Sequence, residues 1–234
     1  MWWHGDLGRR KIQDGANACT HEAIDDTLRI IGRNGEHRDG RVFPLNVLRE
    51  VGHVSHDRLT PWFADLVGID VDRANELDSR MAPQNWQRGI ALYYAGRFGD
   101  GRRQFELHQT VNTADVENAV WHFLCVAREK NVETARAQLI PIQGDARVPM
   151  KEVHRLFAGN ATPADVMKAA EETPAEPRTK QKHLFYARLY LGLYFEATGD
   201  KTRAAEHIRT ASDMAPRDDY MGDVARVHAR RLKE

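Results

Sequence analysis

The chain has 234 residues, of which 34 are Lys or Arg and 34 are Asp or Glu, so its formal net charge is zero. A general nucleic-acid binder carries a basic excess to offset phosphate charge, and the balance therefore predicts no nucleic-acid partner. No apolar run approaches the roughly 18 residues needed to cross a bilayer, so we expect no membrane span.

The cysteines and the start of the chain exclude further classes. Cys19 and Cys125 form neither a CxxC pair nor a Cys/His zinc pattern, so we expect no disulfide framework, metal site or cofactor. Residues 1–15 lack a basic segment followed by a hydrophobic one, which predicts no secretory signal and a cytoplasmic protein. A periplasmic location is the alternative if the N-terminus is incomplete.

The chain divides into two parts. Residues 1–62 show one short helical stripe at 18–31 and an apolar stretch at 43–51 that Gly52 interrupts, so we predict a poorly defined, partly helical segment. From residue 63 the pattern becomes regular, with one apolar helical face formed by Val67, Val71, Ala74 and Leu77. We therefore predict a second domain at 63–234.

Residues 85–112 read as two helices joined by a turn at Gly96. We expect Gly89 on the first helix to face Gly101 on the second, because two positions without side chains let the backbones approach closely. Phe105 would fill the space beside them.

Residues 115–139 repeat this design, with a turn at Asn131. Cys125 follows Gly89 by 36 residues, close to one repeat period of about 34. Since free cysteines are commonly buried and no base is committed to this one, we favour a buried structural thiol over a nucleophile.

The remaining segments alternate irregular and regular units. Residues 140–150 read as a loop, and 150–172 form a short hairpin in which Thr162, Pro163 and Asp165 predict a capped helix start. Residues 173–182 read as a polar linker. In the last hairpin Gly192 and Ala204 repeat the glycine contact, the turn lies at Gly199, and residues 220–232 would cap the stack.

The stretches RGIALYYAGRF and LYLGLYFEATGD resemble tetratricopeptide repeats, and the arrangement over 65–232 is similar to bacterial adaptors of the new lipoprotein I type. The resemblance implies an all-α fold, an α-solenoid of stacked hairpins in a right-handed superhelix with irregular middle hairpins. It also implies a non-catalytic scaffold that binds a protein or peptide on its concave face. Self-association through the ends of the stack is a further alternative.

In tetratricopeptide stacks the first helix of each hairpin lines the concave face. The resemblance therefore implies a partner-binding set of Trp86, Ile90, Tyr93, Tyr94, His122, Tyr186, Leu189, Tyr190 and Leu193. Aromatic side chains with a polar tip suit a groove for a peptide or a helix. The alternative for the same residues is the core between repeats.

Other clusters give weaker signals. His53, His56 and Asp57 could supply metal ligands, which makes an enzyme or metal-dependent protein with an N-terminal site the second hypothesis. The neighbouring acids Asp25 and Asp26, or Glu171 and Glu172, diverge on a helix and make poor acid/base pairs. Arg97, Arg102 and Arg103 are typical of a solvated face. We expect no enzymatic activity.

Overall fold

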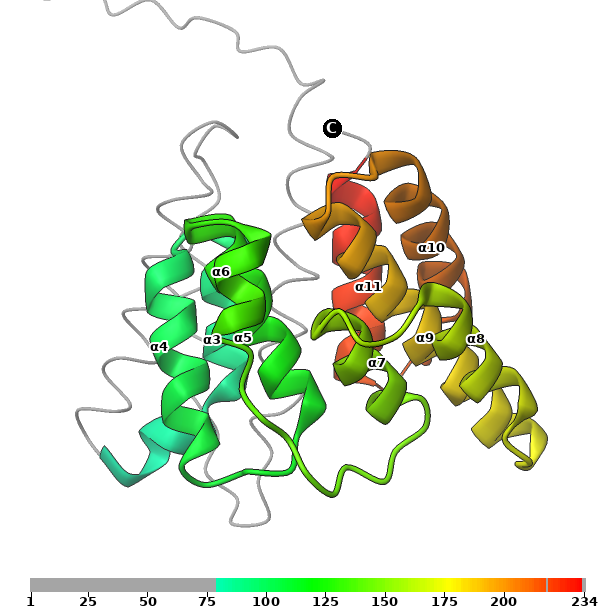
Figure 1. The fold of residues 1–234 in the computed structure, drawn as a ribbon, viewed down its shortest axis with the longest axis horizontal. Helices are drawn as coiled ribbons and strands as arrows, with labels where there is room; N and C mark the ends of the chain where they lie inside the picture. Colours follow the sequence, from blue (N-terminus) through cyan, green and yellow to red (C-terminus); the bar gives the residue numbers. More distant parts are fainter. Residues whose placement is uncertain (1–78, 218, 233–234) are drawn as a thin grey trace, which may run out of the picture.

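The computed structural model describes residues 79–217 and 219–232. These residues form helices and connecting turns, with no β-strand among them, which confirms the predicted all-α class (Figure 1). The predicted N-terminal segment 1–62 and the histidines at 53 and 56 lie outside this range. The elements are η2 (Ser79–Gln84), α3 (Trp86–Tyr94), α4 (Phe98–Gln109), α5 (Val116–Glu129), α6 (Val132–Ala137), α7 (Met150–Phe157), α8 (Pro163–Glu172), α9 (Pro177–Ala197), α10 (Lys201–Met214) and α11 (Tyr220–Arg231).

Local sequence signals set most helix boundaries. The Thr162 hydroxyl accepts a hydrogen bond from the Asp165 amide while the Asp165 carboxylate accepts one from the Thr162 amide, so the predicted capping box is present. The turns expected at Gly96, Gly159 and Gly199 are also present. All three glycines adopt positive φ angles of 75°, 81° and 88°, a region that other residues enter at a steric cost.

One predicted boundary is wrong. Helix α9 begins at Pro177, inside the segment 173–182 that we expected to be a linker. Proline suits the first turn of a helix, where its missing amide hydrogen costs nothing. Lys180, in the first turn of α9, donates from Nζ to the Glu171 carbonyl, 2.7 Å away, and so satisfies the end of α8.

Consecutive helices pack as neighbours, and alternate helices also touch. Contacts join α3 to α4, α4 to α5, α8 to α9, α9 to α10 and α10 to α11. The helices α3, α5, α7 and α9 contact one another in that order, so the first helices of successive hairpins form a continuous layer. Figure 1 shows α3–α6 gathered on one side and α7–α11 on the other, with α5 and α7 between them.

The predicted close contact of Gly89 and Gly101 is confirmed. A methyl group on Gly101 would lie 3.1 Å from the Gly89 carbonyl oxygen and 2.9 Å from the sulfur of Cys125. A methyl group on Gly89 would lie 2.5 Å from Cζ of Phe105, well inside contact distance. Hence Phe105 fills the space that the missing side chain leaves.

The same contact recurs in the last hairpin. A methyl group on Gly192 would lie 2.5 Å from Cγ1 of Ile208, which follows Gly192 by the same number of residues as Phe105 follows Gly89. Ile208 thus stands to Gly192 as Phe105 stands to Gly89, and the expected contact of Ala204 with Gly192 stays a prediction. Ala204 is fully buried nearby.

The hydrophobic core is built around α5. Residues 118–126 of this helix are all buried, as the layer of helices on either side requires. Cys125 is among them, and burial raises the pKa of its thiol above the ordinary value of 9.0. The thiol is therefore protonated at neutral pH, which confirms the expectation of a buried structural cysteine.

The glycine contact predicts the effect of one methyl group. Gly89→Ala should lower the free energy of unfolding by about 1–3 kcal/mol, because the methyl group overlaps the Phe105 ring. Phe105→Leu in the same chain should recover part of this loss. Urea unfolding followed by circular dichroism measures both values.

Gly99→Ala on α4 is the matched control. A methyl group there would lie 3.4 Å from the flexible Glu129 carboxylate, an ordinary contact. Because alanine favours a helix over glycine by about 1 kcal/mol, this variant should be unchanged or more stable. Equal losses for the two alanine variants would contradict the packing argument.

Candidate functional site

The nine residues predicted to bind a partner lie between helices. Seven are buried, namely Ile90, Tyr93, His122, Tyr186, Leu189, Tyr190 and Leu193, while Trp86 and Tyr94 are half-buried. This placement favours the alternative in which these residues belong to the core between helices. That these residues bind a partner stays a prediction.

His122 points toward α4. Its Nε2 atom lies 3.4 Å from the Glu106 carboxylate, and its Nδ1 atom is buried without a hydrogen-bond partner. Burial disfavours the charged imidazole and lowers the pKa of His122 below 6.5. The side chain is therefore neutral at pH 7.

The first and last described α-helices meet along a contact that we call the seam, formed by Trp86 and Tyr94 of α3 and by Tyr220, His228 and Arg231 of α11. The rings of Trp86 and Tyr220 are 4.8 Å apart and nearly perpendicular. The Tyr94 hydroxyl lies 2.9 Å from Nδ1 of His228, and Arg231 donates to the Tyr94 backbone carbonyl over 2.7 Å. The seam thus brings together residues more than 130 positions apart.

Glu196 of α9 extends the seam into a chain of polar contacts. Its carboxylate lies 2.8 Å from Nε2 of His228 and 3.7 Å from the Arg128 guanidinium. Burial of Glu196 opposes ionisation, but the hydrogen bond and charge of His228, with the charges of Arg128 and Arg231, lower its pKa below 4.5.

A second polar cluster surrounds Arg147, which lies just before α7. Its guanidinium donates to the carboxylates of Asp115, Glu117 and Asp145, each over 2.6 Å. Because one cation faces three carboxylates, the cluster keeps an excess of negative charge. The cluster was not predicted, because residues 140–150 carry only loop signals and the spacing from Arg147 to Glu117 follows no motif.

Tyr190, one of the predicted partner-binding residues, is committed to this cluster. Its hydroxyl donates to the second oxygen of Glu117 over 2.5 Å. Burial raises the pKa of Glu117, and the Arg147 charge opposes that shift without cancelling it. Burial also raises the pKa of the Tyr190 hydroxyl, which therefore remains a donor at neutral pH.

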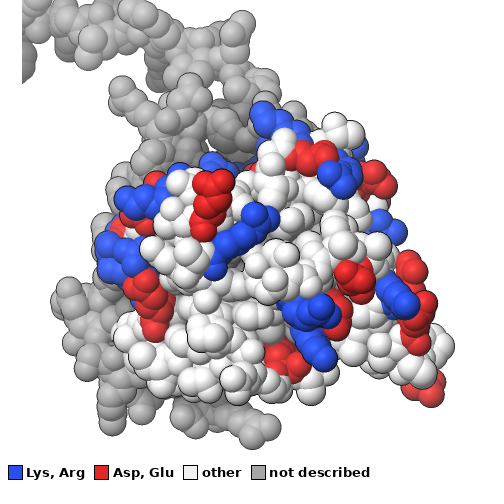
Figure 2. Space-filling model, in the orientation of Figure 1, with Lys and Arg blue, Asp and Glu red and all other residues white. Residues whose placement is uncertain are grey.

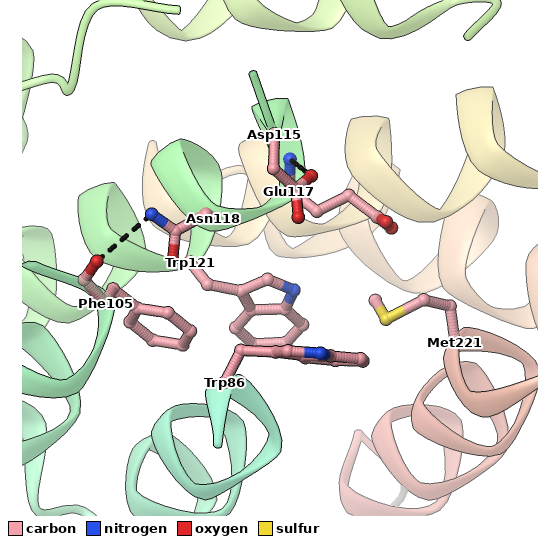
Figure 3. A pocket seen from close by; sticks show the side chains of 7 residues that line it. All are labelled: Trp86, Phe105, Asp115, Glu117, Asn118, Trp121 and Met221. Carbon is pink, nitrogen blue, oxygen red and sulfur yellow. Dashed lines mark hydrogen bonds between the residues drawn. The ribbon is translucent and has the colours of Figure 1, made fainter. Parts of the chain in front are cut away.

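A small cavity lies between this cluster and the seam. Its volume is about 30 Å³, and it is lined by Trp86, Phe105, Asp115, Glu117, Asn118, Trp121 and Met221. Figure 3 shows the Trp121 indole between the ring of Trp86 and the first turn of α5, with Met221 approaching from α11. The lining of the cavity is mainly apolar, and the Trp121 Nε1 and Asn118 Oδ1 atoms of two lining residues are buried without hydrogen-bond partners.

The outer surface carries mixed charges. Figure 2 shows basic and acidic side chains interleaved on the visible face. Arg97 and Arg103 both pair with Asp100, and Arg102 pairs with Glu106 and Glu129. This pairing agrees with the solvated face expected for the three arginines.

Within residues 79–217 and 219–232, no group of three or more His, Cys, Asp or Glu side chains is placed to hold a metal ion. None of the helices described there is both long and apolar enough to cross a membrane. No known family model matches the chain, and no curated protein sequence is significantly similar to it.

The Arg147 cluster predicts a large effect of one substitution. Arg147→Met should lower the free energy of unfolding by about 2–3 kcal/mol, because the carboxylates of Glu117 and the nearly buried Asp145 lose their counter-charge. Lys168→Met is the control. It removes a cation whose ion pair with Glu172 is exposed on both sides, and should cost less than about 1 kcal/mol. Similar values for the two variants in urea unfolding would refute the assignment.

The lowered pKa of Glu196 predicts how stability depends on pH. Its ionised carboxylate stabilises the fold above pH 4.5, and this contribution is lost as the pH falls through the folded-state pKa. Glu196→Gln should therefore be about 1–2 kcal/mol less stable than the wild type near neutral pH. The difference should shrink toward zero in strongly acidic buffer. Parallel urea titrations at several pH values measure it, and a constant difference would rule out the linkage.

Proposed function

We propose that this chain is a tetratricopeptide-like scaffold, a curved stack of helical hairpins that binds a protein or peptide without catalysis. The observation that carries the proposal is the repeated glycine contact. Gly89 receives Phe105 in one hairpin and Gly192 receives Ile208 in another, at the same internal spacing. The two hairpins pack in the same way, and their glycines lie about three periods of 34 residues apart, which supports a repeat architecture.

The continuous layer formed by α3, α5, α7 and α9 supports the same proposal. In a stack of hairpins each unit contacts its neighbours, so the first helices line one face. Partner binding would use the residues of this face that are only partly buried. Among the predicted residues, the half-buried Trp86 and Tyr94 of α3 fit that role best.

The polar contacts already described also suit a binding scaffold. Arg147 holds the first turn of α5 through Asp115 and Glu117, and Tyr190 ties α9 to the same cluster. Such contacts fix the relative position of the helices without leaving a free acid/base pair. A preorganised surface loses less conformational entropy on binding a partner.

Affinity capture with the full chain, followed by chemical cross-linking and mass spectrometry, tests the proposal. We expect reproducible protein partners that cross-link near α3 and α11. Replacing Trp86 and Tyr94 together by phenylalanine, which keeps aromatic packing, should reduce partner recovery at least about fivefold.

Leu107→Ala is the control, since Leu107 is 39% exposed on α4, outside the seam. Its recovery should match the wild type. If the wild type enriches no protein reproducibly, the scaffold proposal fails. If the double variant is folded and recovers every partner, the binding surface lies elsewhere on the chain.

A further inference from the structure

Helix α11 meets α3 through one stripe of polar side chains. Tyr220, His228 and Arg231 are spaced by eight and three residues, which places them on one side of a helix. They contact the ring of Trp86, the hydroxyl of Tyr94 and the carbonyl of Tyr94, in that order. Arg231 also lies over the Tyr94 ring, 5.5 Å from its centroid. Thus the last described helix covers Trp86 and Tyr94, two of the aromatic residues that the sequence assigns to partner binding.

The rest of α11 is held in a different way. Met221, Val224 and Ala225 are buried in the apolar core, and α11 packs along α10. On the α3 side the contacts include hydrogen bonds, ring edges and a guanidinium, and Met221 also lines the small cavity beside Trp86. This is the type of contact that recurs where an amphipathic helix is bound by another protein, with aromatic anchors and a polar rim.

We propose that the α3 face formed by Trp86 and Tyr94, together with Glu196, is a docking surface for a basic amphipathic helix, and that α11 is its built-in occupant. The inference rests on the proposed function and names the partner class. The partner helix presents an aromatic residue, an imidazole and a guanidinium on one side. Glu196 is the acidic group that receives the imidazole, as it receives His228.

Helix α11 is difficult to replace on this surface because it is covalently linked to the rest of the chain. A segment tethered to its own site has an effective concentration on the order of millimolar, so a free helix must compete with that value. Weakening α11 without changing the α3 face removes this competition. A free helix with the α11 sequence should then bind.

The test uses the full chain carrying His228→Ala and Arg231→Ala, and a fluorescent peptide with the sequence of residues 219–232, DYMGDVARVHARRL. Fluorescence anisotropy should show that this variant binds the peptide at least about tenfold more tightly than the wild-type chain does. A peptide with the same two alanines should bind the variant at least about tenfold more weakly. Arg231→Ala alone, at an exposed position, is the second variant if the double substitution unfolds the chain.

Two further variants distinguish binding at this site from binding caused by a general loosening of the fold. Adding Tyr94→Phe and Glu196→Gln to the weakened chain should abolish peptide binding, whereas adding Arg209→Ala on the exposed side of α10 should not. Equal binding by wild type and weakened chain, no binding by either, or binding that survives loss of Tyr94 and Glu196 would overturn the proposal. Captured partners without peptide binding would remove the docking surface and leave the scaffold function standing.

Discussion

Helix α5 packs against five of the other described helices. It contacts α3, α4, α6, α7 and α9, and its residues from 118 to 126 are shielded from solvent on every side. A helix in that position carries few polar side chains, because a buried polar atom without a hydrogen-bond partner costs stability, and only some of the polar atoms of α5 have such partners. Asn118 donates to the Phe105 carbonyl, and the first-turn residue Glu117 is held by Arg147 and Tyr190. Packing around α5 therefore decides which polar groups are buried and what they bind.

The close approach of α3, α4 and α5 also depends on the packing around α5. Gly101 of α4 lies against Cys125 of α5 and against the Gly89 backbone of α3, so three helices converge where two side chains are absent. Dispersion contacts at such a point require a fixed separation, because interiors are packed about as densely as organic crystals. The hairpin geometry is therefore rigid. A rigid hairpin also positions the seam residues Trp86 and Tyr94, because they lie on the same helix as Gly89.

The seam and the Arg147 cluster give the molecule two kinds of buried polar contact with different consequences. The Arg147 cluster ties α5 and α9 to the loop before α7 through charges that lose much of their stabilisation if one partner is removed. The seam joins the first and last described α-helices through side chains with polar tips, next to the carboxylate of Glu196. Of the two, the seam is the more suited to exchange with another molecule, since its contacts to α3 are made by a single helix near the end of the described chain.

Local features of the structure could be derived from the sequence because they depend on neighbouring residues. Thr162 and Asp165 form a capping box four residues long, and Gly96 and Gly199 supply backbone angles that other residues avoid. The contact between Gly89 and Gly101 could also be predicted. Two helices joined by a short turn bring residues twelve positions apart to the same height along the hairpin. Pro177 misled the assignment of the linker because proline is typical both of loops and of helix starts.

The capping box of α8, the glycine turns and the contact of Gly89 with Gly101 could be predicted because each arises from residues close together in the chain, whereas the start of α9 could not. That Tyr94 reaches His228 and that Arg147 reaches Glu117 depends on how distant helices are arranged in space. The physical reason is that the position of α11 against α3 sums a small rotation at every helix contact between them. No local periodicity in the sequence specifies the sum of these rotations. Aromatic residues at the same spacing can therefore line an open groove or, as here, pack against α11.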